Sequence, residues 1–335
     1  MNIVLAILAF SVLIIAHELG HFTLAKLNGV KVEEFSLGMG PLAFSIQGKE
    51  TKYSLRILPI GGYVKMLGDD KKSDDPRAFN NKHPLRKLSI VIAGPIMNII
   101  LAILLFSISS NQGYIIPTIG EVPSGMPAQI SGVMQGDIIT EFNGNKLGAW
   151  NDFLMGMSTN KGEPIQIKVR RNNEIINIPS IKPSYNKEQK RYIVGIVGTL
   201  KKPNVYEAIG YGFKETGFWI KTTGAFFKTL FTGKASMNDV GGPISVARLT
   251  SDAAKAGIYP LLSIAAYISI QLGIFNIIPF PALDGGYIFL YIYQAITRKE
   301  IDDNKIGIVN YIGFIFLMLL MVVVLLKDIL HPLKL

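Results

Sequence analysis

The sequence contains no cysteine, and histidine is scarce, with four residues in 335. Without cysteine the chain can form neither a disulfide nor a thiolate metal site, so any metal must be held by histidine or carboxylate side chains. Charged residues are also few, at 17%, against 49% hydrophobic residues, and the mean hydropathy is +0.34. This composition is too apolar for an ordinary soluble enzyme and predicts a membrane protein that carries a polar insert.

The sequence does not support two other interpretations, a nucleic-acid-binding protein and a cleaved N-terminal signal peptide. The net charge of +10 could indicate nucleic-acid binding, but the basic residues are dispersed and no helix-turn-helix or RNA-binding pattern frames them. We therefore expect no nucleic-acid partner. The apolar N-terminal run has no basic segment before it and no small-residue cleavage site, which predicts a retained membrane span rather than a signal peptide.

Apolar stretches long enough to cross a bilayer, which takes about 20 helical residues, predict about four transmembrane helices. They cover residues 3–25, 88–109, a long stretch over 258–296 that prolines interrupt, and 306–326. The segment between the first two is rich in basic residues: Lys26, Lys31, Lys49, Lys52, Arg56, Lys65, Lys71, Lys72, Arg77, Lys82, Arg86 and Lys87. By the positive-inside rule it lies in the cytoplasm, so the polar middle of the chain lies outside.

The polar segments predict three kinds of structure. Residues 30–66 alternate polar and apolar positions around glycine and proline, as short strands do, and form either a solvated hairpin or an edge that accepts a substrate strand. The stretch "GEVPSGMPAQISGVMQGDIITEFNGNKL" at 120–147 resembles the PDZ family, whose domains bind peptide ends; here the domain could instead be a steric screen. Residues 206–231 place lysines seven residues apart among aromatics, which favours a helix on the membrane surface over a core helix.

These expectations define the fold class and the domain limits. We predict a polytopic α-helical membrane protein with a membrane-associated β-hairpin or small sheet and an inserted β-rich, PDZ-like domain. The predicted segments are 1–110, with two transmembrane helices around the β-rich loop; 111–200, the extracytoplasmic PDZ-like domain; 201–235, the amphipathic surface helix; and 236–335, with two more transmembrane helices.

The first apolar stretch contains the sequence "HELGH" at 17–21. His17 and His21 are four residues apart and therefore share one helix face, where two imidazoles can bind one Zn²⁺. Glu18 is suitably placed to take a proton from a metal-bound water. A charged side chain inside a bilayer costs roughly 2.5 kcal/mol or more, so a compensating function is expected for these residues.

A catalytic zinc site normally has three protein ligands, and Asp284 is the candidate for the third. It is part of "FNIIPFPALDGG" at 275–286 and lies near the middle of the long apolar stretch over 258–296. Pro279 and Pro281 interrupt helical hydrogen bonding there and leave backbone polar groups free, which membranes tolerate only in a protein-lined or watery cavity. A carboxylate and a cavity are thus predicted at one place.

Several motifs together resemble the site-2 proteases, most closely the bacterial RseP-type branch of these intramembrane zinc metalloproteases. They are HExxH in the first span, "AGPIMN" at 93–98, the PDZ-like insert, "DVGGPI" at 239–244 and "NIIPFPALDGG" at 276–286. The resemblance covers nearly the whole chain, but Gram-negative members usually carry two PDZ domains and this chain has room for one.

The resemblance implies both the site and its use. Zinc would be held by His17, His21 and Asp284, with Glu18 as the general base; Gly94 and Pro95 would shape the helix packing, and the substrate would be positioned by Asn276, Pro279, Pro281 and Asn98. The substrates would be membrane proteins with a single transmembrane helix, such as anti-sigma factors, signal-peptide remnants or pheromone precursors. The protein would lie in a bacterial plasma membrane, with its zinc site in the cytoplasmic half.

Two other functions fit parts of the pattern. A zinc transporter could also use intramembrane histidine and aspartate but would need a second coordination station. A non-catalytic, membrane-tethered PDZ scaffold would need no metal. We expect His83, His331 and Asp239 to lie outside the site, the histidines near solvent or headgroups and the aspartate in a turn.

Overall fold

The computed structural model describes residues 2–69, 71–233 and 241–330. The chain divides into two compact units, one formed by residues 1–105 with 222–335 and the other by residues 106–221. Segments from both ends of the sequence therefore build the first unit together. Two helices, α2 (Pro84–Ser109) and α5 (Val205–Phe231), run across the boundaries between the units.

The first unit contains the helices that could span a membrane. In the described part of the chain, four helical segments are long and apolar enough: Ile7–Leu27, Pro84–Gln112, Ile258–Ile277 and Asn304–Leu330. They belong to α1 (Asn2–Leu27), α2 with the short 3-10 helix Ser110–Gln112 that follows it, α7 (Ile258–Ile277) and α9 (Asp303–Leu330). With the β-hairpin and the inserted β domain described below, they confirm the predicted fold class.

The predicted stretch at 258–296 is two helices rather than one. The first, α7, ends at Ile277, and α8 (Asp284–Thr297) begins after the proline-containing loop. At 1.5 Å per residue, the 14 residues of α8 extend over about 21 Å, less than the thickness of a bilayer core. The sequence did not predict α6 (Pro243–Ala256), whose composition is too polar to stand out as a span.

Close helix packing in the first unit depends on glycine. A Cβ built on Gly20 of α1 would lie 3.0 Å from the Cα of Gly94 of α2, so the two backbones are in direct contact there. A Cβ on Gly273 of α7 would lie 3.0 Å from the carbonyl oxygen of Pro95, also in α2. Small residues allow this approach, as is typical of membrane helices. The helix α2 is thereby held between α1 and α7.

The helix α6 packs against α1, α7 and α9. Its N-terminus is capped from α9 by Asp328, which is 1% exposed. One carboxylate oxygen of Asp328 accepts the backbone N–H of Ser245 and the other accepts its hydroxyl, both at 2.8 Å. These bonds and the positive end of the helix dipole compensate for burying a carboxylate in an otherwise apolar helix.

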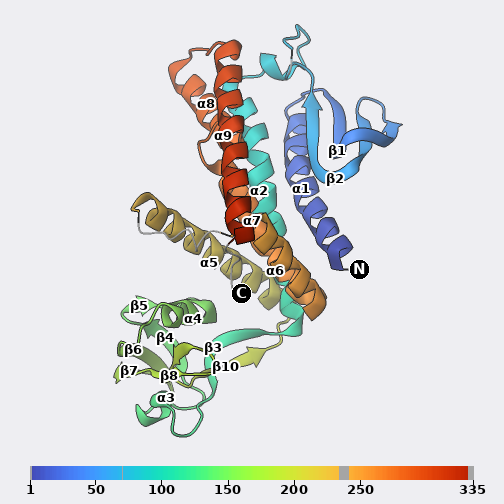
Figure 1. Cartoon of the computed structure of the whole chain (residues 1–335). Coiled ribbons are helices and arrows are strands. Elements are labelled where there is room, and N and C mark those ends of the chain that lie inside the picture. Colours follow the sequence, from blue (N-terminus) through green and yellow to red (C-terminus); the bar gives the residue numbers. More distant parts are fainter. Residues whose placement is uncertain (1, 70, 234–240, 331–335) are drawn as a thin grey trace. The chain divides into compact units, whose positions relative to one another are not determined.

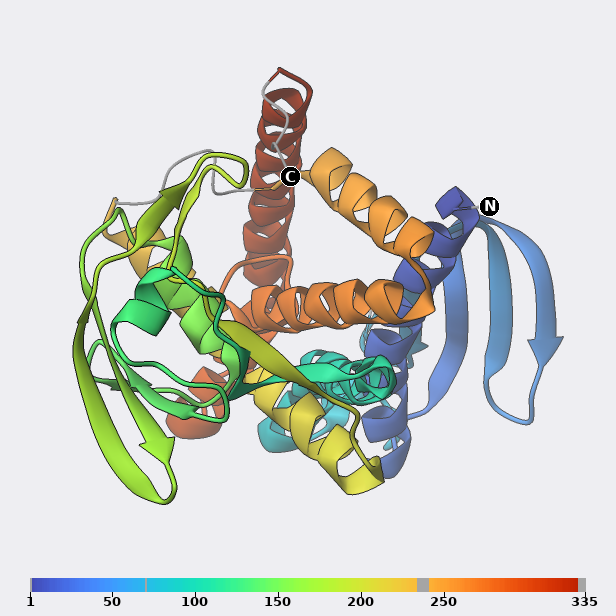
Figure 2. The same ribbon diagram turned by 90° about the horizontal axis from the view of Figure 1, so that it is seen from below.

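The predicted strands at 30–66 form a long hairpin, β1 (Val32–Gln47) and β2 (Lys52–Met66), which lies against α1 in Figures 1 and 2. Near its base, β1 is paired on both sides, because β2 folds back around it: Glu34 pairs with Lys52 on one side and Lys65 on the other. After the hairpin, the short 3-10 helix Phe79–Asn81 precedes α2. Glu34 is a residue of the hairpin strand β1. Burial alone would raise the pKa of Glu34, but its polar neighbours, among them Arg56, which donates to Oε1 of Glu34 at 3.1 Å, hold that pKa below its usual range.

The second unit is the predicted β-rich insert. Its main sheet has the strand order β10-β3-β4-β6-β7, with β5 beside β4, and β8 pairs with β9. The strands are β3 (Tyr114–Glu121), β4 (Ile138–Phe142), β5 (Asn145–Lys146), β6 (Ile165–Arg171), β7 (Glu174–Ile181), β8 (Ser184–Asn186), β9 (Arg191–Ile193) and β10 (Val197–Lys201), and the helices are α3 (Pro127–Ile130) and α4 (Trp150–Ser158). Asn143 and Gly144 have φ of 47° and 79°, as the predicted hairpin turn requires.

The core of the insert is apolar and its helix α4 is tied to α5. Trp150 and Phe153 of α4 pack on the sheet with their side chains buried. Asn151 donates to Oε1 of Glu215 in α5 at 2.7 Å, and the indole of Trp219 donates to the same oxygen at 3.0 Å. Burial raises the pKa of Glu215 despite these donors.

Candidate metal centre

The two histidines of α1 form the first half of the site. His17 and His21 are one turn apart, and their ring centroids are 4.8 Å apart with an interplanar angle of 85°. Their Nε2 atoms are 3.2 Å apart. Both Nε2 atoms are thus turned to one point beside the helix, as the four-residue spacing predicts.

Asp284, the first residue of α8, completes the site. The preceding loop contains Ala282 in the left-handed region, with φ of 69°. A Cβ on Gly285 would collide with the carbonyl group of Ile278, and one on Gly286 would lie 2.7 Å from the carbonyl oxygen of Phe280. The two glycines after Asp284 are therefore required for α8 to begin directly against the end of α7.

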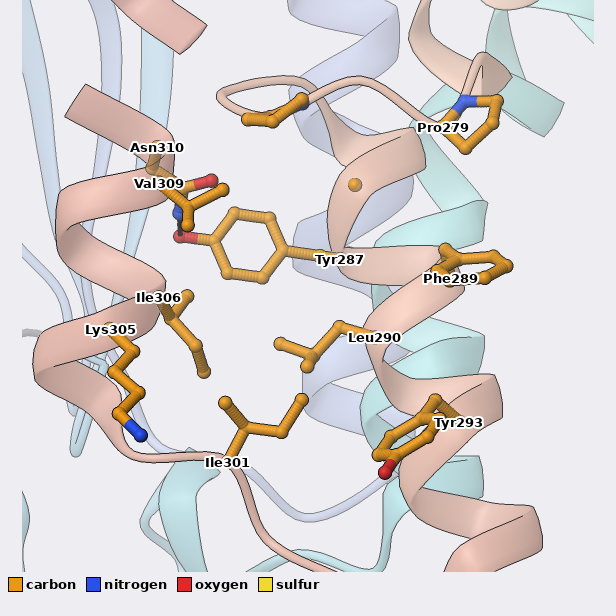
Figure 3. A pocket seen from close by; sticks show the side chains of 12 residues that line it. Pro279, Tyr287, Phe289, Leu290, Tyr293, Ile301, Lys305, Ile306, Val309 and Asn310 are labelled. Atoms are coloured by element: carbon orange, nitrogen blue, oxygen red, sulfur yellow. Dashed lines mark hydrogen bonds between the residues drawn. The ribbon is translucent and has the colours of Figure 1, made fainter. Parts of the chain in front are cut away.

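The helix α9 supports this loop. The side chain of Asn310 accepts the backbone N–H of Ala282 at 3.1 Å. It also donates to the hydroxyl of Tyr287 at 2.7 Å, as Figure 3 shows. Pro279 and Pro281, which were expected to position the substrate, line a cavity of about 440 Å³ between α8 and α9 (Figure 3). Neither histidine of the cluster lines that cavity.

The three candidate ligand atoms converge. Oδ2 of Asp284 is 3.1 Å from Nε2 of His17 and 3.4 Å from Nε2 of His21. Among the described residues, these three form the one group of histidines and carboxylates with the spacing of a metal site. Ligand atoms bound to zinc at about 2.0–2.1 Å in a tetrahedral arrangement lie about 3.4 Å apart. Oδ2 of Asp284 is also buried without a well-formed hydrogen bond, so the residues present fit a zinc ion.

The rings are held from α2. His21 Nδ1 lies 2.9 Å from the carbonyl oxygen of Ile90, to which an N–H at this position donates. A proton on Nδ1 leaves the Nε2 lone pair free for a metal. Gly94 faces both rings, since a Cβ there would collide with the ring of His21 and lie 2.8 Å from Cε1 of His17.

Glu18 lies beside the β-hairpin. A Cβ on Gly62 of β2 would be 3.1 Å from Cγ of Glu18 and 2.9 Å from the carbonyl oxygen of Ser36 in β1. The carboxylate side chain is half-buried. The backbone of the hairpin therefore passes directly by the residue expected to act as the base.

Of the remaining predicted residues, Asn98 contacts a histidine of this centre. The side chain of Asn98 is fully buried, with Nδ2 3.2 Å from Nδ1 of His17. Asn276 is half-buried in the last turn of α7. His83 lies in the loop before α2, where its Nδ1 accepts the N–H of Leu85. The predictions for His331 and Asp239 lie outside the described residues.

Two residues that support the site, Ile90 and Asn310, were not predicted from the sequence. Ile90 acts through its backbone carbonyl group, which no sequence pattern reveals. Asn310 could have been noticed, because an amide in an apolar stretch is costly unless it is bonded.

Comparison with known proteins identifies the family. The family model described as "Peptidase family M50" matches residues 5–320. The chain belongs to peptidase family M50. Membership in M50 confirms the resemblance to site-2 proteases and, with it, the expectation of an intramembrane zinc metalloprotease.

Two relatives cover nearly the whole length of this peptidase. One, from Clostridium acetobutylicum and named as a zinc metalloprotease, is 52% identical over 335 residues, covering 99% of this chain and 98% of its own. Another, the "Regulator of sigma-W protease RasP" of Bacillus subtilis, is 29% identical and covers 98% of each chain. Among solved structures, a PDZ domain of an SdrC-like protein from Listeria innocua is 25% identical and covers 25% of this chain and 92% of its own, with a TM-score of 0.23.

Proposed function

We propose that this M50 peptidase hydrolyses a peptide bond within the transmembrane segment of its substrates, with zinc held by His17, His21 and Asp284 and with Glu18 as the general base. The observation that carries the proposal is the convergence of the three ligand atoms within 4.8 Å of one another. Glu18 follows His17 directly, so a carboxylate lies on the same helix turn as this cluster.

The protein groups supply proton transfer and orientation. When bound, zinc acidifies a water molecule and polarises the carbonyl group that is cleaved. Glu18 takes the proton of the attacking water and delivers it to the leaving amine. The backbone of the hairpin passes beside Glu18, whose side chain is half-buried.

The hairpin is the proposed substrate-binding edge. Residues 62–66 pair with β1 on one side, and in the described residues no strand pairs with their other side. A substrate segment that adds to this edge would be extended, with its peptide groups near Glu18. Extension is required because the carbonyl groups of a helical substrate are hydrogen-bonded within the helix.

The substrates that we propose are membrane proteins with a single transmembrane helix, such as anti-sigma factors or signal-peptide remnants. Support for the first comes from the relative that is named a regulator of sigma-W protease. The basic residues between α1 and α2 favour a cytoplasmic location for that segment and an extracytoplasmic one for the β-rich insert. We propose that the insert excludes substrates with bulky outer domains or binds their trimmed ends.

The test is cleavage of a reporter with one transmembrane helix and a trimmed outer domain by purified protein in detergent. Glu18→Gln should lower the rate at least about 100-fold, because it removes the general base. Asp252→Asn, which neutralises an exposed carboxylate of α6 in the same unit, is the matched control and should cleave normally. Zinc chelation should also stop cleavage. Wild-type cleavage by Glu18→Gln, or cleavage that resists chelation, would contradict the proposal.

A further inference from the structure

Asn98 is a residue of α2 that contacts both α1 and α7. Its side chain is 0% exposed, and its backbone carbonyl oxygen accepts the hydroxyl of Ser269 in α7 at 2.8 Å. A Cβ on Gly273 of α7 would lie 3.5 Å from Cβ of Asn98. The amide points to α1, where Nδ2 is 3.2 Å from Nδ1 of His17. Oδ1 is buried without a hydrogen-bond partner in the described structure.

The two histidines of the centre are held by different kinds of group. Nδ1 of His21 faces the backbone carbonyl of Ile90, which can only accept a hydrogen bond. This contact fixes the proton of His21 on Nδ1. Nδ1 of His17 faces a side-chain amide, which accepts through one end and donates through the other.

The tautomer of His17 depends on which end of the amide it meets. With Nδ2 facing the ring, Nδ1 of His17 is the acceptor and the proton lies on Nε2, toward Asp284. A metal bound by Nε2 requires that proton to be on Nδ1 instead. Rotating the amide by 180° exchanges two groups of nearly equal size and presents Oδ1 as the acceptor.

We propose that Asn98 is the positioning residue of His17: its Oδ1 accepts the Nδ1 proton of the metal-binding tautomer, and its Nδ2 donates to the metal-free one. The proposal rests on the proposed function, in which His17 binds zinc. It also assigns Asn98 to His17 rather than to the substrate, because a fully buried side chain in contact with the ring acts through that ring.

The experiment compares zinc affinity by chelator competition for the full-length protein and its Asn98→Leu and Asn98→Asp variants in detergent. Leucine has nearly the same size but no acceptor, so we expect a 10- to 100-fold loss of affinity, typical of removing a partner that orients a ligand. Aspartate keeps the acceptor, so the affinity should stay within about threefold of wild type. Ser269→Ala removes a contact to the Asn98 backbone and keeps the amide; it should bind zinc normally.

Histidine NMR supplies a signature that a packing role would not change. In zinc-loaded protein with 15N-labelled histidine, both Asn98 variants should shift the Nδ1 resonance of His17 and leave that of His21, bonded to Ile90, in place. This comparison also serves if the leucine variant does not fold. An unshifted His17 resonance, wild-type affinity in Asn98→Leu, or equal losses in the two variants would overturn the proposal.

Failure of the proposed function gives a different result. If His17→Ala binds zinc as tightly as wild type, then His17 is not a ligand and both proposals fail. If His17→Ala loses zinc while Asn98→Leu does not, the zinc site stands and only the assignment of Asn98 is wrong.

Discussion

Replacing Gly94 with alanine should damage the metal centre without changing any candidate ligand. The added methyl carbon would lie 2.8 Å from Cε1 of His17 and would collide with the ring of His21. Ordinary carbon contacts begin at about 3.4 Å, so the ring of His17 must move by about 0.6 Å, and the ring of His21 must move as well. Metal–ligand distances tolerate about 0.2 Å, and a misplacement of about 1 Å costs on the order of 100-fold in rate.

The backbones cannot relieve this overlap easily. Gly20 places α1 in direct contact with α2 at the same level, so separating the helices would open their interface. We therefore expect Gly94→Ala to lower both zinc affinity and reporter cleavage by about 100-fold while the protein stays folded.

The assays are chelator competition and reporter cleavage, with thermal unfolding as the check on folding. Gly224→Ala is the matched control, because a Cβ there meets nothing within 4 Å and alanine favours the helix by about 1 kcal/mol. Wild-type zinc affinity and activity in Gly94→Ala would refute the inference that Gly94 makes room for the imidazoles.

Two further predictions concern the insert and the hairpin. Burial raises the pKa of Glu215 above its ordinary value of 4.5, so the unfolding free energy of the insert should fall as pH rises from 4.5 through the raised value. Glu215→Gln should abolish this pH dependence in denaturant titrations followed by tryptophan fluorescence. An unchanged pH dependence in the variant would exclude Glu215 as its source. Consecutive strand residues direct their N–H groups to opposite sides, so one of Val64→Pro and Lys65→Pro removes only an outward N–H. That variant should keep its fold and cleave the reporter about fivefold more slowly, the equivalent of one hydrogen bond of about 1 kcal/mol; unchanged rates in both variants would exclude strand addition at this edge.

Local patterns in the sequence were sufficient for several parts of the fold. Apolar length predicted the spans, because a bilayer imposes the same requirement on every helix that crosses it. The Asn143-Gly144 turn was predictable for a similar reason, since few residues adopt its backbone conformation. The fold-back of β2 around β1 and the helix α6 were not foreseen, because strand register and the burial of a polar helix depend on the partners they meet.

The sequence by itself determined that two imidazoles and a carboxylate share one turn of α1, because a four-residue spacing on a helix leaves no other arrangement. It also indicated Asp284 as a costly acid that needed a partner. Only the tertiary structure decided that Oδ2 of Asp284 lies 3.1 Å from His17 and that Asn98 meets the other side of that ring. These contacts join residues far apart in the chain, and their geometry depends on the close approach of helix backbones, which no local periodicity encodes.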